Sequence, residues 1–337
     1  MDSTESTSRR HQTNLPVRGS LQWIPWVLGI ALLFAVVAAA LHFSEAQAFV
    51  GLAEQVEPGW FLLALLLQAG TYLAQGEIWR IVGRAASRPL PLLRAYELSL
   101  SKLFIDQALP SSGISGTVVL ARALEARGMP RSVVMAGVVV NLASYNAVYA
   151  ISLGAALLIT IVRHQANLFF EIVSILFLLY GVTVTLAILA LAGRRAAIIR
   201  KTLGRLRLLR PVIKVLEEAD TRLAHDRRLL LQASACQLGI VLLDAATVWV
   251  LLFSLGVIAP FSGVFASFML SSLFRTIGLL PGGLGTFEAT SVLTLKLVGV
   301  PLPAALSATL LFRGLSFWLP MLPGLWFSRR MTARHPD

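Results

Sequence analysis

Cysteine and charged residues are both scarce in this sequence, and each scarcity excludes a class of protein. A single cysteine, Cys236, excludes a disulfide within the chain and a metal site built from several cysteines. The five histidines stand in the tails or near the ends of apolar runs, without the spacing of metal ligands. Charged residues make up 14% of the chain, whereas a soluble domain carries about a quarter. The sequence therefore excludes an ordinary soluble globular protein.

Motifs of enzymes and of ATP-driven pumps are absent as well. The sequence contains no Walker loop, no Gly-x-Ser-x-Gly nucleophile elbow and no acid–base pair that includes histidine. The net charge of +12 does not indicate nucleic acid binding, because the Lys and Arg residues cluster beside apolar runs, where the positive-inside rule explains them. We expect a protein that is not an enzyme, that has no cofactor, metal or catalytic residues, and that does not bind nucleic acid.

Long hydrophobic runs dominate what is present. Hydrophobic residues make up 56% of the chain, and the mean hydropathy is +0.75. A helical membrane span needs about 20 apolar residues, and several runs reach this length. The sequence predicts an all-α polytopic membrane protein with about six full spans, at 24–41, 59–77, 133–161, 168–191, 229–257 and 302–327.

Two further apolar runs are interrupted by proline and glycine in matching ways. The first is broken at Leu109-Pro110-Ser111-Ser112-Gly113-Ile114-Ser115-Gly116, and the second at Leu280-Pro281-Gly282-Gly283-Leu284-Gly285. Pro281 follows Pro110 by 171 residues, and the same offset relates two Gly-x-Pro segments, 128–130 and 299–301. It also relates Ser101 to Ser272 and Leu124 to Leu295. An accidental match of prolines is the alternative to an internal repeat, whose paired interruptions would indicate a transporter's substrate site.

The distribution of basic residues predicts how the chain crosses the membrane. Arginines at 9–18 place the N-terminus in the cytoplasm, and arginines at 329–334 place the C-terminus there too. The arms of the broken runs, 92–127 and 261–300, are too short to span comfortably. We therefore expect two re-entrant helical hairpins, the first entering from the cytoplasm and the second from outside. The alternative is that the hairpin arms are full spans, which gives more crossings.

These predictions divide the chain into a short tail and one membrane domain. Residues 1–20 are expected to form a disordered cytoplasmic tail, and 21–330 a single transmembrane domain built from an inverted repeat of 59–162 and 229–327. Between the repeats, 194–228 carries eleven Lys and Arg residues interleaved with apolar ones. This pattern predicts a basic amphipathic helix on the anionic cytoplasmic leaflet, and a plain cytoplasmic loop is the alternative.

The breaks and the charges inside apolar runs supply candidate binding residues. Free backbone N–H groups in a break, and the start of the following helix, favour an anion such as phosphate. The glycines of the second break would let a ligand approach the backbone, or would serve helix packing. Ionisable residues inside apolar runs are functional candidates, and they are Lys102, Asp106, Asp244, Arg275, Glu288 and Arg313. Arg275 and Arg313 could hold a lipid phosphate, with the three acids as counter-ions or proton carriers. The alternative is structural ion pairs, such as Arg313 with Glu288 or with Asp244.

Together these segments resemble the lysylphosphatidylglycerol synthase transmembrane family, the flippase-like domain of multiple peptide resistance factors and its stand-alone relatives. The first break with Arg122, the segment Leu280 to Glu288, and Gly299, Pro301 and Arg313 carry the resemblance, which covers roughly 24–330. Many members have a Gly-Glu pair in the first break, whereas here Thr117 follows Gly116. We expect a stand-alone member without the soluble synthase domain, so the resemblance implies no aminoacyl transfer.

What the resemblance implies is movement of an anionic lipid or a lipid-linked molecule, of the phospholipid, polyprenyl or hopanoid type, between leaflets of the cell inner membrane. One alternative is a subunit that presents lipid to a separate synthase or glycosyltransferase, and another is an enzyme that modifies lipid head groups. The residues expected to contact the lipid are Lys102, Asp106, Pro110, Ser111, Ser112, Gly113, Gly116, Arg122, Asp244, Arg275, Pro281, Gly282, Gly283, Gly285, Glu288 and Arg313.

Overall fold

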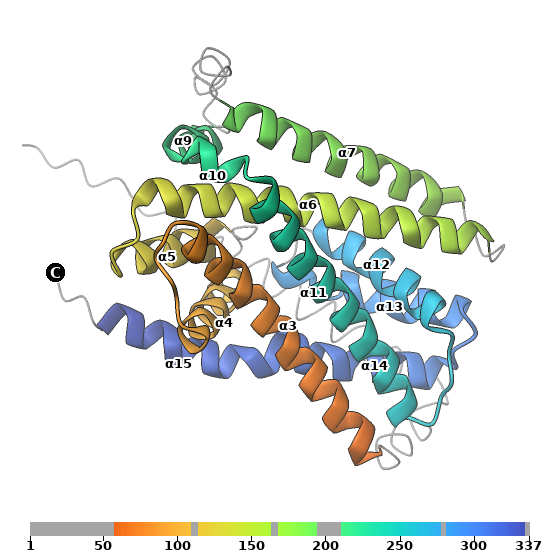
Figure 1. Ribbon diagram of the computed structural model, residues 1–337. Coiled ribbons are helices and arrows are strands. Elements are labelled where there is room, and N and C mark those ends of the chain that lie inside the picture. Colours follow the sequence, from red (N-terminus) through yellow and green to blue (C-terminus); the bar gives the residue numbers. More distant parts are fainter. Residues whose placement is uncertain (1–56, 109–113, 163–167, 194–209, 278–280, 334–337) are drawn as a thin grey trace, which may run out of the picture.

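The computed structural model describes residues 57–108, 114–162, 168–193, 210–277 and 281–333, and every regular element in these ranges is a helix (Figure 1). Within these ranges, five helical stretches are long and apolar enough to cross a membrane. They are α3 (Pro58–Ala85), α6 (Arg131–Val162), α7 (Leu168–Ala192), α11 (Arg227–Ser254) and the continuous run of α14 (Leu302–Arg313), η3 (Gly314–Trp318) and α15 (Leu319–Ala333). The all-α membrane architecture is thereby confirmed. The predicted tail 1–20 and first span 24–41 lie outside the described residues.

Each broken apolar run forms two shorter helices. The first run gives α4 (Leu92–Ala108) and α5 (Ile114–Glu125), and the second gives α12 (Phe261–Ile277) and α13 (Thr286–Leu297). A short 3₁₀ turn, η2 (Pro281–Gly283), lies in the second break. With 12 residues, α5 and α13 each rise about 18 Å, well short of the roughly 30 Å hydrocarbon core of a bilayer.

Within the described residues, 57–162 and 227–333 contain the same series of helices, in the same order and of the same lengths. Helices α3 and α11 have 28 residues each, α4 and α12 have 17, and α5 and α13 have 12. The 32 residues of α6 correspond to the 12, 5 and 15 residues of α14, η3 and α15. The shared element order thus extends well beyond the two prolines that first indicated a repeat.

Predicted matches that follow the breaks have the same local structure. Gly128 and Gly299 both have positive φ, +79° and +95°. The next N–H in each half donates back to a leucine carbonyl, from Met129 to Leu124 at 3.2 Å and from Val300 to Leu295 at 3.1 Å. Both leucine side chains are fully buried. Each helix therefore ends in the same left-handed, glycine-terminated motif before its Gly-x-Pro segment turns the chain.

Ahead of the breaks the register differs by two residues. Helix α3 is followed by a positive-φ residue, Ser87, and helix α11 by another, Gly256. These two residues are 169 positions apart. The N–H of Arg88 donates to the Gly83 carbonyl, and that of Val257 donates to Leu252, with the same spacing of 169. Helices α4 and α12 also start 169 residues apart. Ser101 therefore corresponds to Leu270, and its predicted pairing with Ser272 is wrong because the second break absorbs the extra residues.

Helices α3 and α11 pack together as an antiparallel pair. The Glu57 N–H, just before α3, donates to the Ser254 carbonyl at the end of α11 over 2.9 Å, and further along the pair Gly70 faces Leu243. Around this pair, helices of one half pack on helices of the other. Helix α4 of the first half packs on α15 of the second, and α12 of the second half packs on α6 of the first. Helix α7 lies alongside α6 at one edge of the bundle (Figure 1).

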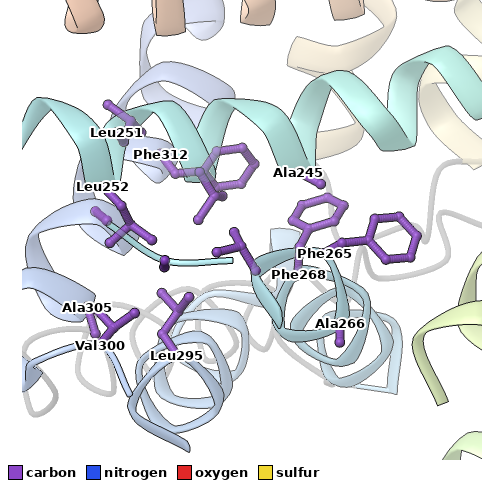
Figure 2. Close-up of a cluster of buried hydrophobic side chains, with 14 of the residues drawn as sticks. Ala245, Leu251, Leu252, Phe265, Ala266, Phe268, Leu295, Val300, Ala305 and Phe312 are labelled. Atoms are coloured by element: carbon purple, nitrogen blue, oxygen red, sulfur yellow. The ribbon is translucent and has the colours of Figure 1, made fainter. Parts of the chain in front are cut away.

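A cluster of aromatic and aliphatic side chains fills the second half. It brings together α11, α12, α13 and α14 through residues such as Leu252, Phe268, Leu295 and Phe312, which meet in Figure 2. The Phe268 ring lies edge-on to the ring of Phe312, with centroids 5.8 Å apart. Because these four helices share one core, the second break between α12 and α13 is supported from several sides.

The described part of the basic segment 194–228 packs on the protein. Residues 210–224 form α9 (Arg210–Glu218) and α10 (Thr221–Ala224), and α11 begins before the segment ends. Ile213 and Leu216 are buried against Val139 and Ala192. The apolar side of α9 is therefore covered by α6 and α7 rather than available for the leaflet. The basic residues of α9 are not part of this cluster, and residues 194–209 lie outside the described residues, so the placement of the segment on the cytoplasmic leaflet stays a prediction.

Candidate functional site

At the second break, Arg313 and Glu288 hold the chain in place. The Nε of Arg313 on α14 donates to Oε1 of Glu288 on α13 over 2.7 Å, and its Nη2 donates to the Gly282 carbonyl over 3.0 Å. The other oxygen of Glu288 accepts the Gly285 N–H over 2.6 Å. The two side chains are 5% and 1% exposed. Arg313 is thus fully engaged in the structure, as the ion-pair alternative stated.

Two aromatic rings complete the surroundings of Arg313. Its guanidinium carbon lies 4.6 Å from the ring centroid of Phe317 and 5.3 Å from that of Phe287. Such ring faces attract a cation. Because one carboxylate, one carbonyl and two rings already contact this guanidinium, Arg313 acts as a positioning residue for the second break.

At the first break, Asp106 has the role that Glu288 has in the second. One oxygen of Asp106 accepts the Gly116 N–H near the start of α5 over 2.9 Å, and the other binds the Lys102 ammonium over 2.6 Å. A Cβ on Gly116 would collide with this carboxylate. An acid therefore caps α5 although Thr117 follows Gly116, and it comes from α4.

These carboxylates change the expectation that the helix starts bind phosphate. The N–H groups of Gly116 and Gly285 both donate to carboxylates of the protein itself. A carboxylate at a helix N-terminus satisfies the same partial positive charge that would attract a phosphate. The predicted anion sites at these two N–H groups are therefore occupied from within the chain.

The glycines of the second break make room for neighbouring side chains. Gly282, Gly283 and Gly285 all have positive φ, between +63° and +80°. A Cβ on Gly282 would collide with the Phe317 ring, and one on Gly283 with the Arg275 side chain. These two glycines thus make close contacts within the protein, and the contact of Gly283 places Arg275 directly on the break.

Arg275 itself has no carboxylate partner among the described residues. It stands in the last turn of α12, is partly exposed, and forms none of the ion pairs found within 4.0 Å. Its charge acts electrostatically on Asp244, Tyr149 and Arg313. Among the predicted cations, Arg275 and the exposed Arg122 are therefore the two without a carboxylate within 4.0 Å in the described ranges, and of these Arg275 contacts the second break.

Asp244 on α11 is held by uncharged groups of α3. Its Oδ1 accepts hydrogen bonds from Gln68 Nε2 at 3.2 Å and from Thr71 Oγ1 at 3.1 Å. The sequence reading missed these partners. Their signal is a stripe at helical spacing inside an apolar span, namely Gln68, Thr71, Tyr72 and Gln75, which share one face of α3.

Tyr72 of the same stripe binds the π-helical turn η3. Its hydroxyl contacts the carbonyls of Leu315 and Ser316, both at 3.2 Å. Within η3 the Leu319 N–H donates to Gly314, five residues back, and this leaves the Leu315 carbonyl without its usual partner. Pro320 removes the N–H that would have bound Ser316. Tyr72 therefore satisfies two carbonyls that the turn exposes immediately after Arg313.

The predicted site residues fall into two groups that meet. Asp244, Arg275, Glu288, Arg313 and the break 281–285 form one group around α11 to α14. Lys102, Asp106 and Gly116 form the other, and α4 contacts η2 between them. Arg122 is exposed in the last turn of α5, apart from both. Four predicted site residues of the first break lie outside the described residues: Pro110, Ser111, Ser112 and Gly113. That the loops of the two breaks face each other therefore stays a prediction.

Comparison with known proteins gives one result for nearly the whole chain. A family model described as the lysylphosphatidylglycerol synthase TM region matches residues 26–324. A search of curated proteins found no match. The matched range contains both broken runs and every charged residue of the two groups.

Proposed function

We propose that this chain, which belongs to the lysylphosphatidylglycerol synthase TM region family, moves an anionic lipid or lipid-linked molecule between the leaflets of a bacterial cytoplasmic membrane. In this proposal the head group passes through the protein interior while the hydrocarbon chains stay in the bilayer. In this proposal both termini lie in the cytoplasm, which is supported by the arginines before the first predicted span and by those beyond the last.

The observation that carries the proposal is the position of Arg275. Charged side chains at membrane depth are expensive, and they are paired or functional. Lys102 and Arg313 each bind a carboxylate within 2.7 Å, whereas no described carboxylate lies within 4.0 Å of Arg275. A guanidinium is suited to two hydrogen bonds with one phosphate. We assign to Arg275 the binding of the anionic head group beside Gly283.

Alternating access would come from the two halves. Matched helix lengths and the antiparallel packing of α3 and α11 support an inverted repeat about an axis in the membrane plane. The 12-residue arms α5 and α13 support re-entrant hairpins, because neither is long enough to span. In such an arrangement the interrupted helices meet near the middle of the bilayer, where a head group is passed from one half to the other.

A hydrolytic or transfer reaction is less well supported. Asp106 and Glu288 each accept a backbone N–H and bind a cation, so neither is available as a general base. Movement of a lipid needs no such base. Mass spectrometry of vesicle lipids separates the two possibilities, because a translocase leaves the lipid composition unchanged.

The test is transfer of head-group-labelled phosphatidylglycerol in vesicles that contain the purified protein. We expect transfer well above that of empty vesicles, and a loss of at least about tenfold in Arg275→Ala, the equivalent of one lost charge-assisted contact. Arg122→Ala is the matched control, because Arg122 is exposed and apart from the site. Equal rates for Arg275→Ala and the native protein would rule out Arg275 as the head-group ligand. Absence of transfer for any anionic lipid would overturn the proposed function.

A further inference from the structure

We propose that Asp244 is a reversible proton-binding residue that couples movement of the two halves to a proton gradient. This inference rests on the proposed translocation, for which it names the energy source. The step is the exchange of one proton between the Asp244 carboxylate and water, and no other bond is made or broken.

Asp244 differs from the other two acids of the site in the charge of its partners. Asp106 binds Lys102 over 2.6 Å and Glu288 binds Arg313 over 2.7 Å, so each is half of an ion pair. Asp244 has no cation within 4.0 Å among the described residues. Its hydrogen-bond donors are an amide and a hydroxyl. A carboxylate held by neutral groups can gain a proton without leaving a buried cation unpaired.

Gln68 and Thr71 can each form a hydrogen bond with Asp244 whether its carboxyl group is ionised or protonated. Gln68 is 2% exposed and donates through Nε2, while its Oε1 is buried without a partner among the described residues. After rotation of the amide, Oε1 can accept the proton of a neutral Asp244. Thr71 Oγ1 contacts the Leu67 carbonyl at 3.4 Å as well as Asp244. It can therefore direct its hydrogen to Leu67 and accept from Asp244 instead.

The charged and titratable groups around Asp244 come from four helices. On α3, Tyr72 lies within the electrostatic influence of Asp244, and its hydroxyl accepts a hydrogen bond from Gln68 Nε2 over 3.4 Å. From α12, Arg275 supplies the positive charge that acts on the carboxylate. On α14, Arg313 is paired with Glu288, and on α6 the phenol of Tyr149 interacts with Arg275. Arg275 therefore senses whether Asp244 is charged.

The location of Asp244 connects its protonation to movement. It stands where α11 crosses α3, and these are the corresponding helices of the two halves. Ionised Asp244 accepts from two α3 side chains and attracts Arg275. Neutral Asp244 reverses the direction of at least one hydrogen bond and no longer attracts Arg275. Protonation thus changes the contacts between the halves and frees the Arg275 charge for an anionic head group.

Infrared difference spectroscopy of the full chain in phosphatidylglycerol vesicles tests proton binding without any transport. We expect a protonated-carboxyl band that appears on acidification, is lost in Asp244→Asn, and persists in Asp106→Asn and Glu288→Gln. Thr71→Val keeps the carboxylate and should shift the midpoint of the titration. A band that is unchanged in Asp244→Asn, or no titrating band in the native protein, would overturn the assignment. If Asp244→Asn does not fold, Asp244→Glu and Thr71→Val test the assignment instead. Each of these two variants must shift either the position of the protonated-carboxyl band or the midpoint of its titration.

A second measurement separates this inference from the proposed function. Transfer of labelled phosphatidylglycerol is followed with and without a pH difference across the vesicle membrane. We expect the pH difference to drive net transfer in the native protein, and Asp244→Asn to exchange lipid without any response to pH. Transfer that responds equally in Asp244→Asn, or that follows a sodium gradient at constant pH, overturns proton coupling alone. Absence of all transfer overturns the proposed function, while the infrared result still decides whether Asp244 binds a proton.

Discussion

Tyr72 on α3 donates its hydroxyl hydrogen into the carbonyls of η3, with Ser316 at 3.2 Å, across 244 residues of sequence. Ser316 lacks a helical donor because residue 320 is proline, and the neighbouring carbonyl of Leu315 is freed by the five-residue step of the π turn. One side chain of the first half therefore stabilises the irregular turn that follows Arg313 in the second half.

Tyr72→Phe should destabilise the protein while leaving its packing almost unchanged. Loss of the hydroxyl removes the one hydrogen that these two part-buried carbonyls share, which costs about 1–3 kcal/mol. The measurement is thermal unfolding in detergent, followed by tryptophan fluorescence. Tyr180→Phe is the control, because Tyr180 is 55% exposed on α7. An equal unfolding temperature for the two variants would show that Tyr72 does not support η3.

The pair formed by Glu288 and Arg313 should be strongly coupled. Removing either partner leaves a charge buried without its counter-ion, and breaking a buried pair costs about 3–5 kcal/mol. We expect Glu288→Gln and Arg313→Met each to lower the unfolding temperature markedly. The double variant should lose less than the sum of the two, because no unpaired charge remains. Additive losses in this double-mutant cycle would contradict the coupling.

Gly283→Ala and Gly128→Ala separate backbone strain from displacement of Arg275. Both glycines have positive φ, +64° and +79°, which costs an alanine about 1–2 kcal/mol. Space around Gly128 is open, whereas a Cβ on Gly283 would meet the Arg275 side chain. Both variants should therefore be less stable, but only Gly283→Ala should also slow lipid transfer. Equal transfer rates in the two variants would show that the position of Arg275 does not matter.

Asp106 should protect the start of α5 against amide exchange. Its carboxylate accepts the Gly116 N–H over 2.9 Å, and loss of a cap of this kind costs about 1 kcal/mol. Hydrogen–deuterium exchange should be faster across the first turn of α5 in Asp106→Ala. In Lys102→Met the carboxylate still reaches Gly116, so exchange there should stay close to native. Equal protection in both variants would contradict the capping role.

Much of the architecture could be predicted from apolar runs and from proline and glycine positions. Five predicted spans correspond to long helices, and Leu124 and Leu295 occupy the same position in two identical helix ends. These features are local, so sequence spacing determines them. The predicted pairing of Ser101 with Ser272 is wrong because no constant offset relates the two halves across a break whose length differs between them.

Contacts between helices were much harder to predict. Asp244 was chosen for its charge alone, and its partners Gln68 and Thr71 lie more than 170 residues away. Their meeting depends on how α3 and α11 are rotated about their own axes, which hydropathy does not determine. The polar stripe on α3 carried that information, because four polar residues on one face of an apolar helix need a polar neighbour. Which cation each acid binds likewise depends on packing, as Arg275 and Arg313 show.

Helix α7 determines the relative direction of everything that follows it. A unit made of one span, a hairpin that returns to its own side, and a second span crosses the bilayer an even number of times. Two such units joined directly would start on the same side, and their first helices would run parallel. In the proposed topology α7 crosses once between the units and makes the total odd, which agrees with the antiparallel packing of α3 and α11. In that topology, removing α7 from the chain would not merely shorten the bundle: it would turn the proposed inverted pair of units into a tandem one.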